Sequence, residues 1–291
     1  MSTGPGTAPA PGCDLVVQAG HVVREDLDVL LALTQADGIE PLSRAQCDAF
    51  RLCAPRQLEG VDEALAAVRY DWANVPRERT LDRVRLVAMD MDSTLITIEC
   101  IDEIADMLGI KPEVAAITSA AMRGEIEFRE SLSRRVALLA GLPVAALERV
   151  YDERLRLSPG AERLLDALRA IGARTLLVSG GFTFFTDRLQ ARLRIDCALS
   201  NVLEILDGRL TGRVVGDIVD ARGKAEMFSR LAARCRGEGG LAVAIGDGAN
   251  DLPMLAAADV SIAWRAKPKV RAQATHAIDY CGLDAVLNLF A

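Results

Sequence analysis

The sequence is poor in the residues that several common kinds of functional site require. It contains two histidines, His21 and His276, and they lie far apart in the chain. Because zinc sites draw on clustered histidines and cysteines, this spacing argues against a zinc site. An enzyme with a histidine nucleophile would also lack its usual partners. Any catalysis by this chain is therefore expected to depend on carboxylates.

Cysteine pairs, an excess of basic residues and long apolar runs are absent as well. The seven cysteines are dispersed and form no C-x-x-C pair, which favours reduced thiols and a cytoplasmic location. The formal net charge of -7 argues against a nucleic-acid partner, because phosphate backbones need a basic face. No apolar run approaches the roughly 20 residues that a membrane helix needs, so no membrane partner is expected.

The first part of the chain predicts a leader and a small domain. Residues 1–12 are small, proline-rich and uncharged, and they lack the basic start of a secretory signal, so we expect a disordered leader. Residues 13–82 predict a small α+β domain. Its expected elements are a strand at Asp14–Ala19, helices at Arg24–Thr34 and Gly60–Ala73, and a linker at Asn74–Arg85.

Residues 83–291 predict an α/β domain with a Rossmann-like parallel sheet, because short apolar runs alternate there with amphipathic helices. The expected strands are Val84–Met89, Arg174–Val178, Leu241–Ile245 and Val260–Ala263. Residues from about 99 to 157 predict consecutive helices, at Ile101–Leu108, Pro112–Arg123, Phe128–Leu139 and Val144–Arg154. A helical insertion after the first strand is expected to cover the end of the sheet as a cap. Asp207-Gly208 predicts a β-hairpin over Leu203–Val215.

Three of the expected strands end in polar or glycine-rich clusters, at Asp90–Thr94, Ser179–Gly181 and Gly246–Asp251. Ligands bind beyond the carboxyl ends of parallel strands, so these clusters are expected to meet at one site. Asp90 and Asp92 project from the same side of an extended chain. One could attack phosphorus while the other handles the proton of the leaving group. A hard cation such as Mg²⁺ would offset the repulsion between carboxylate and phosphate.

Each cluster taken alone also has a purely structural interpretation. An Asp-x-Asp pair can be a helix N-cap beside a surface charge. Ser179-Gly180-Gly181 could cradle phosphate oxygens or simply form a tight turn. Lys224 stands at an expected helix start, where the macrodipole disfavours a cation, so it either pairs with an anion or is solvated. The glycines beside Asp247 allow close approach to a metal or phosphate, although an Asp-rich structural loop is an alternative.

Taken together, the clusters resemble the haloacid dehalogenase superfamily. The matching pattern runs from Val84 to about Ala291 and comprises Asp90-x-Asp92, Ser179, Lys224 and Gly-Asp247-Gly-x-x-Asp251. The resemblance implies that Asp90 is a nucleophile that forms an aspartyl-phosphate and that Asp92 is the general acid, then the base. It implies that Asp90, Asp247 and the backbone carbonyl of Asp92 hold Mg²⁺, with Asp251 supporting the metal. Lys224 and Ser179 would stabilise the transferring phosphoryl group.

Within that superfamily, the run from Asp90 to Ala105 and the segment Ala121–Gly124 look like those of phosphoserine phosphatases. The resemblance implies that Glu99 receives the α-ammonium group of phosphoserine and that Arg135 binds its carboxylate. The substrate roles of that family fall on Glu99, Met122, Phe128, Arg135, Ser179, Gly180, Gly181, Lys224 and Asn250. Phe128 and Arg135 are two helical turns apart and share a face. Without the resemblance, Phe128 and Met122 would be read as core residues and Arg135 as a solvated one.

The expected function is therefore Mg²⁺-dependent hydrolysis of phosphoserine, the last step of serine biosynthesis. A phosphotransferase that passes the phosphoryl group to another alcohol would share these motifs. A non-catalytic amino-acid-binding protein would have no reason to retain Asp90, Asp92 and Lys224, and a broad sugar-phosphate phosphatase would not need Glu99 with Arg135. Similar phosphatases carry an N-terminal ACT-like domain, but only parts of its βαββαβ pattern are visible here. That domain could sense an amino acid or form a homodimer.

Overall fold

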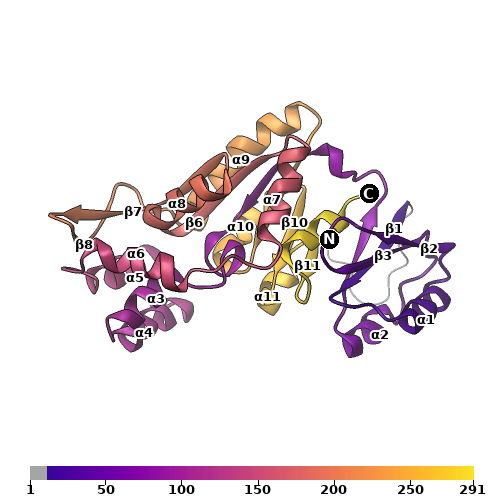
Figure 1. Cartoon of the computed structure of the whole chain (residues 1–291), viewed down its shortest axis with the longest axis horizontal. Coiled ribbons are helices and arrows are strands. Elements are labelled where there is room, and N and C mark those ends of the chain that lie inside the picture. The colour runs from indigo at the N-terminus through magenta and orange to yellow at the C-terminus, as the bar shows by residue number, and fades with distance from the viewer. Residues whose placement is uncertain (1–11) are drawn as a thin grey trace.

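The computed structural model describes residues 12–291, so the expected leader lies outside the described residues apart from its last glycine. Two separate sheets organise the described chain, one of four strands near the N-terminus and one of seven (Figure 1). The seven-stranded sheet lies in the middle of the molecule, the four-stranded sheet lies at one end, and a group of helices lies at the other (Figure 1).

The four-stranded sheet has the complete βαββαβ order of a split βαβ fold. Its elements are β1 (Cys13–Ala19), α1 (Arg24–Thr34), β2 (Gly38–Leu42), β3 (Asp48–Cys53), α2 (Val61–Val68) and β4 (Asp71–Pro76). The strands lie in the order β2-β3-β1-β4, and all neighbours are antiparallel. The sequence showed only parts of this pattern. Every residue of β1 is buried, because helices cover one face of the sheet and the C-terminal segment packs against the other.

Two expectations for this region are wrong. The helix expected at Gly60–Ala73 ends at Val68, where Arg69 turns into the left-handed region with a φ of 59°. The linker expected at Asn74–Arg85 begins inside β4, which pairs with β1. Residues of β4 alternate between buried and half-buried, which is the period of a strand, but the run is short and follows directly on an alanine-rich helix.

The seven-stranded sheet confirms the expected α/β class. Its order is β11-β10-β9-β5-β6-β7-β8, and all neighbouring strands are parallel except β7 and β8. The strands are β5 (Val84–Met89), β6 (Arg174–Phe182), β7 (Cys197–Leu206), β8 (Arg209–Val215), β9 (Leu241–Gly246), β10 (Val260–Trp264) and β11 (His276–Ile278). The packing helices are α7 (Ala161–Ala170), α8 (Thr183–Leu193), α9 (Ala221–Gly237), α10 (Leu252–Ala256) and α11 (Pro268–Arg271). The expected hairpin is present, and Asp207 and Gly208 both have the positive φ that its two-residue turn requires.

The expected helical insertion is also present. It contains α3 (Cys100–Met107), α4 (Lys111–Met122), α5 (Phe128–Ala137), α6 (Val144–Arg149) and a π-helical turn (Val150–Arg154). These helices gather beside the β7–β8 hairpin (Figure 1). The two segments that connect them to the sheet pair with each other through a bridge between Ile96 and Leu157. We call this helical group the cap; its exact boundaries at 99 and 157 stay a prediction, as does the domain boundary at 82.

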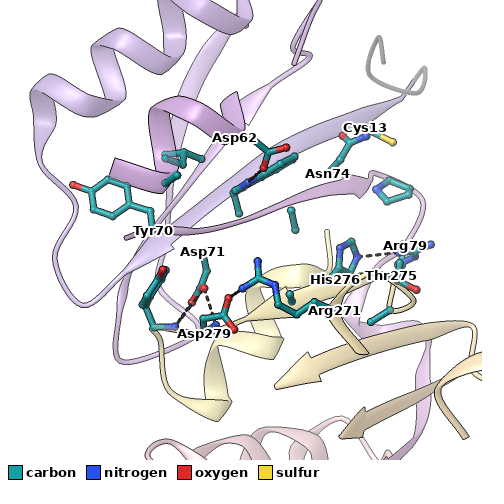
Figure 2. A pocket seen from close by; sticks show the side chains of 18 residues that line it. Cys13, Asp62, Tyr70, Asp71, Asn74, Arg79, Arg271, Thr275, His276 and Asp279 are labelled. Atoms are coloured by element: carbon teal, nitrogen blue, oxygen red, sulfur yellow. Dashed lines mark hydrogen bonds and ion pairs between the residues drawn. The ribbon is translucent and has the colours of Figure 1, made fainter. Parts of the chain in front are cut away.

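The two sheets meet along the edges of β4 and β11, around a cavity of about 500 Å³ (Figure 2). The carboxylate of Asp71 accepts hydrogen bonds from the backbone N–H groups of Asp279, Tyr280 and Cys281, at 2.7, 3.0 and 2.9 Å. On the other side of the cavity, the guanidinium of Arg79 lies 3.2 Å from His276 Nε2. These contacts hold the sheets together at a distance from the polar clusters. Within residues 12–291, no helix combines the length and the apolar character needed to cross a membrane.

Candidate active site

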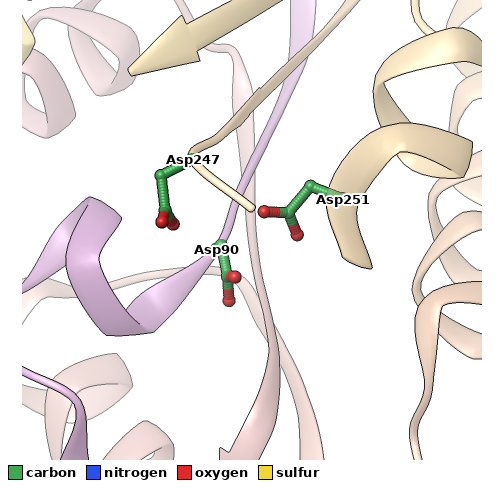
Figure 3. A group of neighbouring side chains, drawn as sticks. All are labelled: Asp90, Asp247 and Asp251. Carbon is green, nitrogen blue, oxygen red and sulfur yellow. The ribbon is translucent and has the colours of Figure 1, made fainter. Parts of the chain in front are cut away.

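The ends of the central strands bring the polar clusters together as expected. β5 lies between β6 and β9, so Asp90 and Asp247, which follow β5 and β9, lie at the ends of one strand pair, next to Ser179, which belongs to the last part of β6. The backbone N–H of Asp90 donates to the carbonyl of Ile245 at 3.1 Å, which joins the first cluster to β9 just before the third cluster begins. Figure 3 shows the side chains of Asp90, Asp247 and Asp251 as close neighbours that come from separate segments of the chain.

Asp90, Asp247 and Asp251 form a group that fits a divalent metal ion. One carboxylate oxygen from each lies within 4.8 Å of the others. All three donors are oxygens, the ligands that hard cations prefer. The Asp92 carboxylate is not in this group, and instead its Oδ1 accepts a hydrogen bond from the backbone N–H of Cys100 at 3.0 Å.

Lys224 is buried among these carboxylates and is not a solvated lysine. Its Nζ lies 2.8 Å from Asp90 Oδ2 and 2.9 Å from Asp251 Oδ1, and its side chain is 1% exposed. Burial opposes its charge, but Asp90 and Asp251 raise the pKa of Lys224 above its ordinary value. Lys224 lies in the first turn of α9, whose N-cap, Asp220, accepts a hydrogen bond from Gly223 N–H at 2.9 Å. Its ion pairs explain why a cation stands at a helix N-terminus.

The carboxyl groups of the site are crowded enough to hold protons more tightly than usual. Burial and the nearby Asp251 raise the pKa of Asp90 well above its ordinary value and that of Asp247 to about 6. Burial and the neighbouring Glu99 raise the pKa of Asp92 to about 7. The positive charge of Lys224 therefore does not balance the negative charge of these carboxylates. A site with such an excess of negative charge favours the binding of a divalent cation.

Residues 179–181 bulge out of the ladder near the end of β6, and we call them the phosphate loop after the role that the sequence predicts for them. Gly181 N–H donates to Ser179 Oγ at 2.8 Å. A β-carbon on Gly181 would stand 2.9 Å from Asp92 Oδ2, so only glycine leaves room for that carboxylate. A β-carbon on Gly180 would stand 3.2 Å from the ring of Phe128, the first residue of α5. The loop thus touches Asp92 on one side and the cap on the other.

The remaining expected residues are Asn250, which lies beside the carboxylate group, and three residues of the cap helices. Asn250 Nδ2 lies 3.4 Å from Asp90 Oδ2, within the group. Glu99 is the N-cap residue of α3 and accepts a hydrogen bond from Ser93 Oγ at 2.7 Å. Arg135 is half-buried on α5, and burial lowers its pKa, although the negative charges of Asp102, Glu99 and Asp92 act against this. Met122 is 68% exposed at the end of α4.

Two residues that make hydrogen bonds at the site were not predicted from the sequence. Thr94 Oγ1 donates to Asp247 Oδ1 at 3.0 Å and so orients a carboxylate from another strand. Its position in the first cluster was the available signal, because a hydroxyl two residues after Asp92 stays near the strand end. Asn201 makes two hydrogen bonds beside the phosphate loop. No motif surrounds it, so nothing in the sequence singled it out.

Comparison with known proteins shows which protein family the chain belongs to. A family model described as haloacid dehalogenase-like hydrolase matches residues 84–259, more than half of the chain. The chain therefore belongs to the haloacid dehalogenase-like hydrolase family.

The relatives point to one activity within that family. A phosphoserine phosphatase from Polaromonas sp. is 56% identical over 214 residues, which make up 72% of this chain and 91% of that protein. A probable phosphoserine phosphatase from Vibrio cholerae, in its unliganded form, superposes with a TM-score of 0.81 at 36% identity, covering 96% of this chain and 86% of that one. A haloacid dehalogenase family hydrolase from Salmonella enterica serovar Typhi gives 0.83 at 35% identity, covering 95% and 98%. The last two similarities include the four-stranded sheet.

Proposed function

We infer that this chain is a phosphoserine phosphatase, which hydrolyses O-phosphoserine to serine and inorganic phosphate in the last step of serine biosynthesis. The observation that carries this inference is the buried Asp90 carboxylate, held by Lys224 and Asn250 at the strand ends beneath the cap. The high identity to the Polaromonas enzyme over nearly its whole length gives the substrate.

The chemistry is assigned to two carboxylates. An oxygen of Asp90 attacks phosphorus, and Asp92 gives its proton to the serine oxygen as the P–O bond to serine breaks. Asp92 then takes a proton from the water that attacks the aspartyl-phosphate, which releases phosphate and restores Asp90. A pKa of about 7 suits Asp92 to both roles, because it holds or releases a proton near neutral pH. Lys224 and Ser179 would contact the phosphoryl oxygens.

The proposed cofactor is Mg²⁺. Asp90, Asp247 and the backbone carbonyl of Asp92 would hold it, with Asp251 in support; the all-oxygen donor set favours this ion type. When bound, Mg²⁺ supplies positive charge that lets a carboxylate approach a phosphate dianion.

The cap is proposed to select the substrate. Glu99 would receive the ammonium group of phosphoserine, and Arg135 would bind its carboxylate. Phe128, Met122 and Gly180 would line the space between them. The contact between Phe128 and Gly180 supports this arrangement, because it brings the face of α5 that carries Arg135 over the phosphate loop.

A substrate panel tests the function. We expect phosphate release from phosphoserine to exceed that from phosphothreonine and sugar phosphates, and to stop when EDTA removes the metal and resume with added Mg²⁺. Comparable rates on sugar phosphates would contradict the proposed substrate. Phosphate release that falls when an acceptor such as homoserine is added, with formation of a new phosphoester, would favour the phosphotransferase instead.

Two further expectations concern the whole protein. A cytoplasmic location and a homodimer formed through the four-stranded sheet stay predictions. Light scattering of the purified chain would test the second, and a monomer at all concentrations would contradict it.

A further inference from the structure

The strand that carries the phosphate loop is interrupted just where the loop begins. β6 and β7 pair up to Val178 and pair again from Phe182, and the register shifts between these two points. Residues 179–181 of β6 face a single residue of β7 across this gap. A bulge of this kind breaks the ladder of backbone hydrogen bonds. The phosphate loop therefore needs another partner to fix its backbone.

Asn201 supplies that partner from β7. Its side chain is buried, with 1% of the residue exposed. Its Nδ2 donates to the carbonyl of Gly180 at 2.8 Å, and its Oδ1 accepts from the N–H of Val219, also at 2.8 Å. Both amide groups are thus used, and each satisfies a backbone group that would be costly to leave unpaired in the interior.

The second hydrogen bond leads to the helix that carries Lys224. Val219 immediately precedes Asp220, the N-cap of α9, and Lys224 lies one turn further along. Asp220 also pairs with Arg129 of the cap helix α5 at 2.9 Å. One buried amide therefore connects the phosphate loop with the start of α9, next to the point where the cap helix α5 contacts α9.

We propose that Asn201 is a positioning residue for phosphoryl transfer, which fixes the phosphate loop relative to Lys224. It acts through Gly180 and Val219 and touches no reacting atom itself. The inference rests on the proposed function, because it assigns the loop and Lys224 to the phosphoryl group. Groups that stabilise a transferring phosphoryl must be held in place beforehand, and a displacement of about 1 Å can cost about 100-fold in rate. Loss of Asn201 should consequently lower kcat more than it raises KM.

Two variants and one matched control test this role. Asn201→Asp keeps the acceptor for Val219 but removes the donor to Gly180, and Asn201→Ser is the smaller alternative if a buried charge prevents folding. The control is Thr186→Val, which removes the buried 2.7 Å hydrogen bond to Ser200, the neighbouring residue on β7. Turnover of phosphoserine and of p-nitrophenyl phosphate is measured at a temperature where circular dichroism shows each protein folded.

We expect the Asn201 variants to lose roughly ten- to hundredfold in kcat, by the same factor on both substrates, with KM nearly unchanged. Thr186→Val should lower the melting temperature and keep the wild-type kcat. Wild-type kcat in the folded Asn201 variants, or an equal loss in Thr186→Val, would reduce Asn201 to a structural role. If the wild-type chain hydrolyses p-nitrophenyl phosphate but not phosphoserine, the proposed substrate fails, while the comparison on p-nitrophenyl phosphate still decides the role of Asn201.

Discussion

At the scale of single residues, the site is dominated by acidic groups that face one buried cation. Asp90 and Asp251 both contact Lys224, and Asp247 completes the carboxylate group. Like charges held this close destabilise each other unless a further cation or a proton is present. The crowding of these carboxylates therefore lowers the stability of the metal-free protein, and the ion pairs of Lys224 offset only part of this cost.

Replacing Asp90, the proposed nucleophile, should separate activity from stability. We expect Asp90→Asn to lose at least about 10³-fold in turnover, because an amide cannot attack phosphorus. The melting temperature should stay the same or rise in metal-free buffer, since one of the crowded charges is removed. Phosphate release and thermal unfolding measure the two effects. Turnover near the wild-type rate would rule out Asp90 as the nucleophile.

Recognition of the substrate carboxylate can be tested on α5. Arg135→Ala should lose about 100-fold in kcat/KM for phosphoserine, because a charge-assisted hydrogen-bonded pair is removed, but little for p-nitrophenyl phosphate, which has no carboxylate. Arg134→Ala is the matched control, since Arg134 is exposed and pairs with Glu130 on the same helix. Equal losses on both substrates in Arg135→Ala would remove the case for carboxylate recognition.

At the scale of elements, the phosphate loop depends on a strand end with little free space. Gly181→Ala would place a methyl group 2.9 Å from Asp92 Oδ2 and 3.0 Å from Ser179 Oγ. We expect a loss of roughly tenfold or more in kcat, because Asp92, the proposed general acid, and the phosphate loop must move apart. Gly237→Ala, where a β-carbon meets no atom within 4 Å, is the control and should keep full activity. An active Gly181→Ala enzyme would show that this close packing is not needed.

The elements that the sequence predicted correctly are those with a strong local signal. β5, β9 and the cap helices have long apolar runs or a clear helical period, and the Asp207-Gly208 turn has a specific backbone requirement. Burial alternates along β4, but its buried positions include Asp71, so hydrophobicity alternates only weakly and the strand was misassigned. β11 was not expected because three residues carry no period. Both strands form because of their tertiary contacts, and the local sequence does not encode those contacts.

The residues of the site also divide into those with a local sequence signal and those without one. Asp90 and Asp247 stand in recognisable motifs after two predicted strands, so their convergence was predictable because ligands bind beyond the carboxyl ends of parallel strands. Lys224 lies on a helix, and from the residues alone its pairing with these carboxylates was one of two open alternatives. Asn201 was not predictable, because its role depends on a register shift between two strands and on a loop 18 residues further along. Such contacts follow from the three-dimensional arrangement and not from any spacing in the chain.

At the scale of the whole molecule, the interface between the two sheets contains a buried histidine, His276 (Figure 2). Burial and the charge of Arg79 lower the pKa of His276 to about 3. The unfolded chain takes up a proton near pH 6.5, whereas the folded chain does not, so stability is lost as the pH falls from about 6.5 toward 3. The largest slope is about 1.4 kcal/mol per pH unit.

His276→Gln should remove this part of the pH dependence while its amide oxygen still accepts from Arg79. Between pH 7 and pH 5, we expect the wild type to lose about 2 kcal/mol more unfolding free energy than the variant. Urea unfolding at the two pH values measures the difference. The same pH dependence in both proteins would mean that His276 is protonated in the folded state.

The hydrogen bonds of Asp71 link the C-terminal loop of the seven-stranded domain to the four-stranded sheet, which not every relative has room for. The Polaromonas relative aligns over most of its own length with only 72% of this chain, so a catalytic unit with little room for the four-stranded sheet exists in nature. Here, however, three successive amides of the C-terminal loop rely on a carboxylate from that sheet. Removing that sheet would take away the carboxylate and leave these amides to bond with water, so the C-terminal loop of this chain is adapted to the presence of the sheet.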